Sequence, residues 1–127
     1  MNATPTPNDD PTARLDAQAR ARLHARDTDG RHGVVARVLA TFESSLLRQL
    51  AQLDEARERG DAGEIGRVAH TLKSSSASIG ALALSAVCAE VEQAVRAGET
   101  AELVKDVDRL LAEGRGALVA VRAILHP

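Results

Sequence analysis

Apolar side chains recur every three or four residues through most of this 127-residue chain, which is the spacing of one face of an α-helix. The longest such run predicts a helix from about His32 to Arg59. Its apolar face consists of Val35, Val38, Leu39, Phe42, Leu46, Leu50 and Leu53. Gly60 follows directly and is the expected stop, since helices commonly end at a glycine.

A second apolar face predicts a helix between Asp61 and Gly80. Asp61 and Glu64 stand at the spacing at which an N-cap carboxylate and a reciprocal glutamate both bind free amides of a first turn. When each residue is placed about 100° from the last, the apolar face spans about 60° on either side of one direction. It comprises Ile65, Val68, Ala69, Leu72, Ser76 and Ile79. Gly80 is expected to end this helix in a left-handed conformation.

Two further helices are predicted after Gly80. The first runs from Ala81 to about Ala97, with an apolar face of Leu84, Val87, Cys88, Val91 and Val95. The second begins near Thr100, and its inner face carries Leu103, Val107, Leu110, Leu111, Leu118, Val121 and Leu125. Gly114 and Gly116 interrupt it, and each costs about 1 kcal/mol in a helix interior. We therefore expect either a bend or a close approach to a neighbouring helix at this point.

The N-terminal part of the chain is patterned more weakly. Residues 1–11 contain three prolines and several polar residues, which predicts a disordered tail. A short helix is expected from Thr12 to about Arg26, ended by the turn residues 27–30, with one face formed by Leu15, Ala19 and Leu23.

Short links join all these helices, and no segment has the alternating pattern of a strand. The sequence therefore predicts an all-α fold. We expect an antiparallel four-helix bundle with an additional short N-terminal helix, formed as one domain by residues 12–127.

Composition excludes several classes of function. The chain has a formal net charge of −2 and a single aromatic residue, Phe42, so it lacks both the basic field and the stacking surface of a nucleic-acid-binding protein. Aromatic side chains also commonly line small-molecule pockets. No segment approaches the roughly 18 apolar residues that span a bilayer, and the N-terminus has no basic and apolar leader. We expect a soluble protein of the cytoplasm that does not bind membranes.

The residues that commonly bind metals or nucleotides form no site. Cys88 is the only cysteine, which fits a reducing compartment, and its place on an apolar face predicts a buried, unreactive thiol. His24, His32 and His126 share no ligand spacing with one another or with His70, so no metal site is expected. The chain also has no glycine-rich phosphate loop, so nothing supports nucleotide binding or kinase activity of its own.

His70 is the candidate for chemistry, because it lies about 140° from the apolar face of its helix. Its neighbours at helical spacing are Arg67, Lys73, Ser74 and Ala77. With an ordinary pKa of roughly 6.5, the imidazole is largely unprotonated near neutral pH, so a ring nitrogen can act as a nucleophile. The ammonium group of Lys73 suits phosphate oxygens. The pair indicates a transiently phosphorylated histidine, and the alternative is an ordinary surface histidine.

Glu92 is expected near His70 on the following helix. The short link at Gly80 predicts an antiparallel helix pair, in which residues equally far before and after the turn face each other. This places Glu92 within about one turn of His70. An alternative role for Glu92 is a simple surface ion pair with Arg96, one helical turn further on.

The sequence around His70 resembles a known family. The residues that carry the resemblance are His70, Leu72, Lys73 and Gly80, followed by Leu82, Leu84, Cys88 and Glu92. Residues 61–98 are similar to the signature of the histidine-containing phosphotransfer (HPt) domains of bacterial and eukaryotic phosphorelays. One position departs from this signature, because the family usually has glycine where this chain has Ser74. Serine is small, so we expect the substitution to affect transfer rate and partner affinity rather than the assignment.

The resemblance implies a phosphoryl carrier with no kinase activity of its own. His70 would accept a phosphoryl group from the aspartate of a receiver domain and pass it to another receiver, with Lys73 stabilising the group. Glu92 would supply an oxygen to the second ring nitrogen and so fix the tautomer. A receiver would dock over the helices predicted at 32–59 and 61–80.

Three residues are expected to contact that partner: Arg67, Ser74 and Ala77. The partners implied are response-regulator receiver domains or a hybrid sensor histidine kinase, and the Mg²⁺ ion needed for transfer would come from the receiver. The chain itself is expected to hold no cofactor and to be a monomer. Two alternatives are a helical adaptor that docks to such partners without being phosphorylated, and a dimeric bundle.

Overall fold

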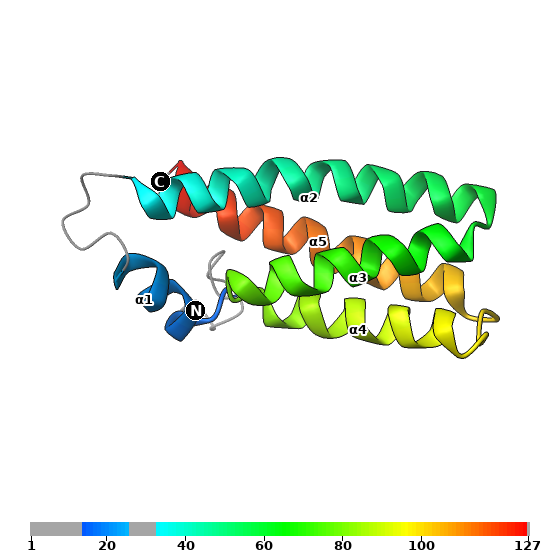
Figure 1. The fold of residues 1–127 in the computed structure, drawn as a ribbon. Helices are drawn as coiled ribbons and strands as arrows, with labels where there is room; N and C mark the ends of the chain where they lie inside the picture. The colour runs from blue at the N-terminus through cyan, green and yellow to red at the C-terminus, as the bar shows by residue number, and fades with distance from the viewer. Residues whose placement is uncertain (1–13, 26–32, 127) are drawn as a thin grey trace, which may run out of the picture.

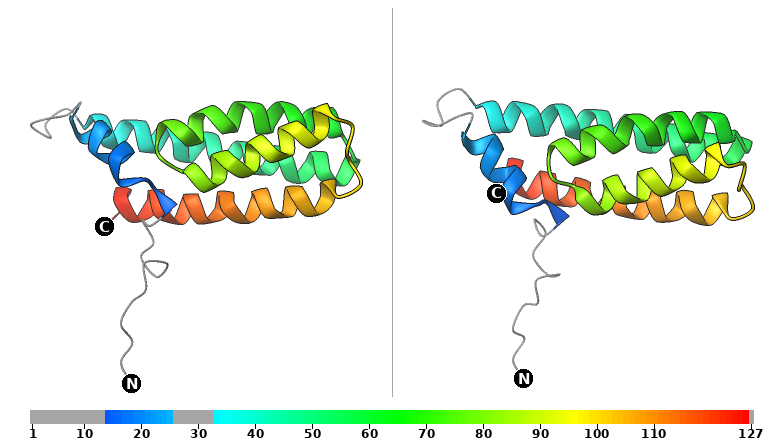
Figure 2. Two further views of the ribbon diagram at one scale, coloured as in Figure 1. Left: turned by 90° about the horizontal axis from the view of Figure 1, so that it is seen from below. Right: turned by 60° about the horizontal axis from the view of Figure 1, so that its bottom comes forward.

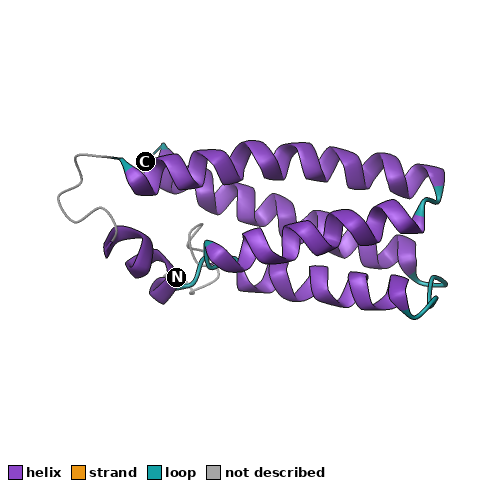
Figure 3. Ribbon diagram, in the orientation of Figure 1, coloured by secondary structure: helices purple, strands orange, loops and turns teal. Residues whose placement is uncertain are grey.

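Helices make up nearly all of the part of the chain that the structure describes. The computed structural model describes residues 14–25 and 33–126, and in these ranges no strand occurs (Figure 3). The helices are α1 (Ala17–Ala25), α2 (Val34–Arg59), α3 (Ala62–Ser78), α4 (Leu82–Arg96) and α5 (Leu103–Leu125). The predicted tail at 1–11, the turn at 27–30, residue His32 and the side chains of Leu23 and His24 lie outside the described residues.

Helices α2 to α5 form an antiparallel four-helix bundle, which confirms the predicted fold class (Figure 1). Going around the bundle, α2 packs on α3, α3 on α4, α4 on α5, and α5 returns to α2. The additional helix α1 lies against the end of the bundle at which α3 turns into α4, as the views from below also show (Figure 2). None of the described helices combines the length and hydropathy needed to cross a lipid bilayer.

Among the described residues, the apolar faces predicted for α2 to α5 point into the bundle. The largest fully buried side chains are Leu39, Leu46, Leu53, Ile65, Leu72, Leu84, Leu110, Val68, Val91, Val107, Val121 and Cys88. Burying a large aliphatic side chain contributes roughly 1.5–3 kcal/mol, so this core holds the four long helices together. Cys88 is buried, as predicted, and this burial raises the pKa of its thiol to about 12.

The start of α3 follows the predicted N-cap only in part. The carboxylate of Asp61 accepts a hydrogen bond from the backbone N–H of Glu64 at 3.1 Å, as expected. The predicted reciprocal bond from the Glu64 side chain is wrong, because the backbone N–H of Asp61 already donates to the carbonyl of Ala56 at 2.9 Å. Glu64 instead binds the guanidinium group of Arg67 through both carboxylate oxygens, at 2.8 and 2.7 Å.

Helix α5 continues unbroken through Gly114 and Gly116, and the close approach to neighbouring segments expected there is present. A Cβ atom at Gly114 would lie 2.5 Å from Cδ2 of Leu50 on α2. One at Gly116 would overlap the side chain of Arg14, which also forms an ion pair with Glu113. The two glycines therefore let α2 and the segment before α1 pack closely on α5.

The turn between α3 and α4 is where the N-terminal segment attaches. Gly80 has φ 86°, which is left-handed, and its carbonyl accepts a hydrogen bond from the backbone N–H of Asp16 at 2.7 Å. A Cβ atom at Gly80 would lie 2.6 Å from Cβ of Ala19. Leu15 and Ala19 are buried there, so the segment covers the turn that sets α3 beside α4.

Substituting Gly80 should therefore destabilise the protein in two ways. Gly80→Ala imposes a left-handed backbone on a residue with a Cβ atom and also pushes that atom against Ala19. We expect urea unfolding to show a loss of roughly 2–4 kcal/mol. Gly98→Ala is the matched control, since Gly98 has φ 72° but a Cβ atom added there would meet nothing within 4 Å. The control should lose only about 1 kcal/mol, and equal losses would contradict the packing of the N-terminal segment on this turn.

Candidate functional site

His70 lies on α3 and points into solvent, as predicted. Its side chain is 62% exposed, whereas its neighbours Ala69 and Leu72 are fully buried in the core. The periodicity of α3 explains this difference, because the residues that anchor the helix lie on the opposite side from the imidazole. The ring is therefore accessible to another macromolecule without any rearrangement of the bundle.

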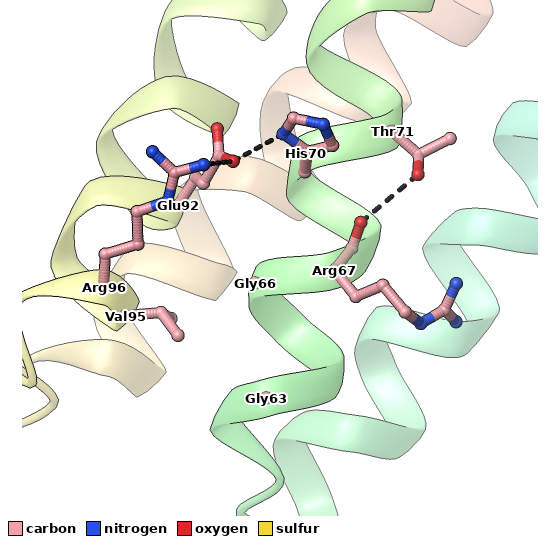
Figure 4. A pocket seen from close by; sticks show the side chains of 8 residues that line it. All are labelled: Gly63, Gly66, Arg67, His70, Thr71, Glu92, Val95 and Arg96. Carbon is pink, nitrogen blue, oxygen red and sulfur yellow. Dashed lines mark hydrogen bonds and ion pairs between the residues drawn. The ribbon is translucent and has the colours of Figure 1, made fainter.

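Glu92 on α4 is the centre of the site. Its side chain is only 8% exposed, and its Oε2 atom lies 2.5 Å from Nδ1 of His70. The same carboxylate binds Nζ of Lys73 through Oε1 at 2.6 Å and the guanidinium group of Arg96 through Oε2 at 2.9 Å. Figure 4 shows His70, Glu92 and Arg96 converging between α3 and α4. The two interactions of Glu92 that the sequence left open, with the imidazole and with Arg96, are thus present together.

The charges around Glu92 decide the protonation of the site. The hydrogen bond from Lys73 lowers the pKa of the Glu92 carboxyl most, burial opposes this shift, and His70 and Arg96 lower the pKa further. Glu92 is therefore ionised at neutral pH and can only accept hydrogen bonds. In the neutral ring Nδ1 must then carry the proton that it shares with Glu92, which leaves the lone pair on Nε2.

A close approach of α3 and α4 brings Glu92 to His70. A Cβ atom at Gly66 would lie 2.9 Å from Cγ1 of Val95, so only glycine fits there without a shift. Beside His70 this packing leaves an open hollow of about 340 Å³ (Figure 4). It is lined by Gly63, Gly66, Arg67, His70, Thr71, Glu92, Val95 and Arg96. Helical periodicity places Val95 on an apolar face but carries no signal that it meets Gly66, so this contact was not predicted.

Lys73 lies one turn after His70 on α3, as expected, but its ammonium group is not free. We expected an ammonium group free to meet a phosphoryl group beside the ring, but in the structure it is bound to Glu92. The side chain remains 35% exposed, on a long and flexible stem. Lys73 and His70 therefore share one carboxylate.

The three residues expected to contact a partner all lie on the surface of α3. Arg67 is 62% exposed on its side chain, but its guanidinium group is held by Glu64 and extends away from Glu92 (Figure 4). This pair lowers the pKa of the Glu64 carboxyl and raises that of Arg67, in both cases chiefly through their hydrogen bonds. Ser74 and Ala77 are exposed further along the helix. Because these two side chains are small, the surface of α3 beyond His70 carries no bulky group at either position.

The described part of the chain contains no cluster of three or more histidine, cysteine, aspartate or glutamate side chains able to hold a metal ion. His126 is exposed at the end of α5. The side chains of His24 and His32 are outside the described residues.

Comparisons with known proteins agree with this helical-bundle fold. The family model described as the Hpt domain matches residues 37–124, which is well beyond the stretch at 61–98 that carried the resemblance in the sequence. Among solved structures, the chain is similar to the crystal structure of histidine-containing phosphotransfer protein B (HptB) from Pseudomonas aeruginosa PAO1. The two share 27% sequence identity with a TM-score of 0.73, over 88% of this chain and 90% of that chain. No curated protein sequence matches the chain.

The depressed pKa of Glu92 predicts a pH-dependent contribution to stability. As the pH falls, the unfolded chain takes up the proton on this carboxyl first, near the ordinary value of 4.5, while the folded protein still holds it ionised. The stabilisation is therefore complete above 4.5 and is lost as the pH falls through the lower folded-state pKa. Unfolding free energies of the unmodified chain and of Glu92→Gln, measured from pH 7 to pH 3, should converge at the acid end. A difference that is constant over this range would contradict the shift.

Proposed function

This chain belongs to the Hpt domain family, and from this membership and the geometry of the site we propose that His70 is the residue that carries the phosphoryl group. The protein is a histidine phosphotransfer protein of a phosphorelay. One observation carries the choice of His70: it is an exposed histidine on α3 whose Nδ1 is bound by a buried carboxylate. The nucleophilic nitrogen is therefore Nε2, which faces solvent.

The transfer step follows from this tautomer. The Nε2 lone pair attacks the phosphorus atom of an aspartyl phosphate on a receiver domain, so that an N–P bond forms. The bond between phosphorus and the aspartate oxygen breaks, and its electron pair leaves with the aspartate. Because Nδ1 keeps its proton, the ring becomes positively charged, and the adjacent negative charge of Glu92 stabilises it. By the reverse of this step, His70 passes the phosphoryl group to the aspartate of a second receiver.

Little else is required of the carrier, because phosphoryl transfer depends mainly on positioning and on charge stabilisation. We propose that Lys73 supplies positive charge to the phosphoryl oxygens. The Mg²⁺ ion would be supplied by the receiver domain, which fits a carrier that has no kinase activity of its own. The partners are receiver domains of response regulators or of a hybrid sensor histidine kinase.

The surface over α2 and α3 is the proposed docking site for the receiver. Ser74 and Ala77 allow a close approach next to His70, and Ser74 in place of the family's glycine would tune its affinity. Arg67 would meet acidic groups of the partner, where charges at a rim raise the rate of encounter more than the affinity. We expect the chain to act as a monomer in the cytoplasm, where a buried free thiol such as Cys88 fits the reducing environment.

Replacing His70 should abolish phosphorylation without affecting the fold. Purified receiver domains carrying a radiolabelled aspartyl phosphate should transfer the label to the unmodified chain in an acid-labile form, and His70→Gln should accept none. Because the side chain lies outside the core, the melting temperature should change little. His126→Gln removes another exposed histidine and is the matched control, which should be labelled normally.

The same experiment separates the carrier from the adaptor. A helical adaptor that only docks to receiver domains predicts no label on the unmodified chain. Label that persists in His70→Gln would instead assign the phosphoryl group to another residue.

Lys73→Ala should slow the transfer without abolishing it, because the ammonium group stabilises the phosphoryl group but forms no bond to it. We expect a reduction of about ten- to a hundredfold in the rate constant, measured in the same transfer reaction by rapid quench. Lys105→Ala is the control, since Lys105 is a highly exposed lysine on α5. An unchanged rate in Lys73→Ala would show that this ammonium group does not act on the phosphoryl group.

A further inference from the structure

Glu92 binds two cationic side chains, Lys73 and Arg96. In the proposed function, Lys73 must act on the phosphoryl oxygens instead. The ammonium group of Lys73 lies 2.6 Å from Oε1 of Glu92, and the guanidinium group of Arg96 lies 2.9 Å from Oε2. If Lys73 acts on the phosphoryl oxygens, it must leave Glu92 to do so. The carboxylate would then lose the partner that lowers its pKa most.

Losing that partner is costly at a buried site. The side chain of Glu92 is 8% exposed, and removing one of its cationic partners leaves this carboxylate less well compensated than before. Without another cation to take its place, Lys73 would be held on Glu92. The attraction that positions its ammonium group at rest would then oppose the movement of this group to the phosphoryl oxygens.

Arg96 has the properties of such a substitute. It lies one turn beyond Glu92 on α4, and within the described residues Glu92 is the partner that the structure gives it. Its guanidinium group carries a permanent positive charge, and its N–H groups donate to carboxylate oxygens. Its side chain is 66% exposed, so core packing does not fix it in place. Figure 4 shows it beside the carboxylate of Glu92.

We propose that Arg96 is a positioning residue that holds the charge of Glu92 while Lys73 moves to the phosphoryl group on His70. This inference rests on the proposed function. At rest, the negative charge of Glu92 is shared by Lys73 and Arg96. After transfer, Glu92 faces the positively charged ring and Arg96, while Lys73 faces the oxygens of the new phosphoryl group. No proton leaves the site, and the only bonds made and broken are those of the transfer.

The test uses the full chain with phosphoramidate, a small phosphoryl donor, so that docking to a partner plays no part. Phosphohistidine formation is followed by ³¹P NMR, and the ammonium resonance of Lys73 by ¹H–¹⁵N correlation in the same samples. Arg96→Gln should slow phosphorylation about tenfold and keep the Lys73 resonance at its resting position. Arg96→Lys retains the positive charge and should remain within about threefold of the unmodified rate.

A double-mutant cycle with Glu92→Gln tests whether Arg96 acts through Glu92. The neutral amide needs no counter-charge, so adding Arg96→Gln to Glu92→Gln should change the rate less than about twofold. Arg109→Gln is the matched control, because Arg109 binds Glu90 between α4 and α5 at 2.5 Å and is also an exposed arginine. It should leave both the rate and the Lys73 resonance unchanged.

Several results would overturn the proposal. If Arg96→Gln slows the reaction equally in both backgrounds, Arg96 acts directly on the phosphoryl group rather than on Glu92. If Arg96→Gln has no effect, or if Lys73 moves normally in this variant, no substitute is needed. If Arg96→Lys is as slow as Arg96→Gln, charge is not what Arg96 supplies. An unmodified chain that forms no phosphohistidine on His70 would overturn the proposed function, and this inference with it.

Discussion

The ionised carboxylate of Glu92, buried between α3 and α4, is the interaction on which the functional site depends. It binds the imidazole of His70, the ammonium group of Lys73 and the guanidinium group of Arg96. A single acceptor therefore fixes the tautomer of the His70 ring and positions two cations beside it. Because the carboxylate is buried, these interactions are stronger than the same contacts would be in water.

The bundle is built so that this carboxylate can reach α3. The turn at Gly80 sets α3 and α4 antiparallel, and the segment before and within α1 packs on that turn. Near the other end of α3, the absence of a side chain at Gly66 lets Val95 approach. The two contacts fix the spacing and the register of α3 against α4, and hence the distance from Glu92 to His70. The core residues beneath them hold the helices in place while His70 stays exposed.

A phosphoryl carrier needs a stable scaffold more than it needs an enclosed active site. Its reaction partners arrive on other proteins, so the nucleophile must be open to them and its orientation must exist before they dock. In this protein the orientation of the His70 ring comes from the buried side chain of Glu92, and the ring itself is exposed to solvent. Glu92 on α4 provides the orientation, and His70 on α3 provides the accessible ring. The open hollow beside His70 leaves the charged groups around Glu92 within reach of an incoming phosphoryl group.

The sequence by itself determined the helices, their buried faces and the exposure of His70, because each depends on a local repeat of about 3.6 residues. Local spacing also identified the N-cap at Asp61 and placed Glu92 near His70 across a short turn. Only the tertiary structure decided which side chains of neighbouring helices meet, namely Lys73 on Glu92 and Gly66 against Val95. These contacts depend on the distance and register between packed helices and on competition for each donor. A periodic pattern specifies which face of a helix is buried, but not which atoms of the neighbouring helix that face will touch.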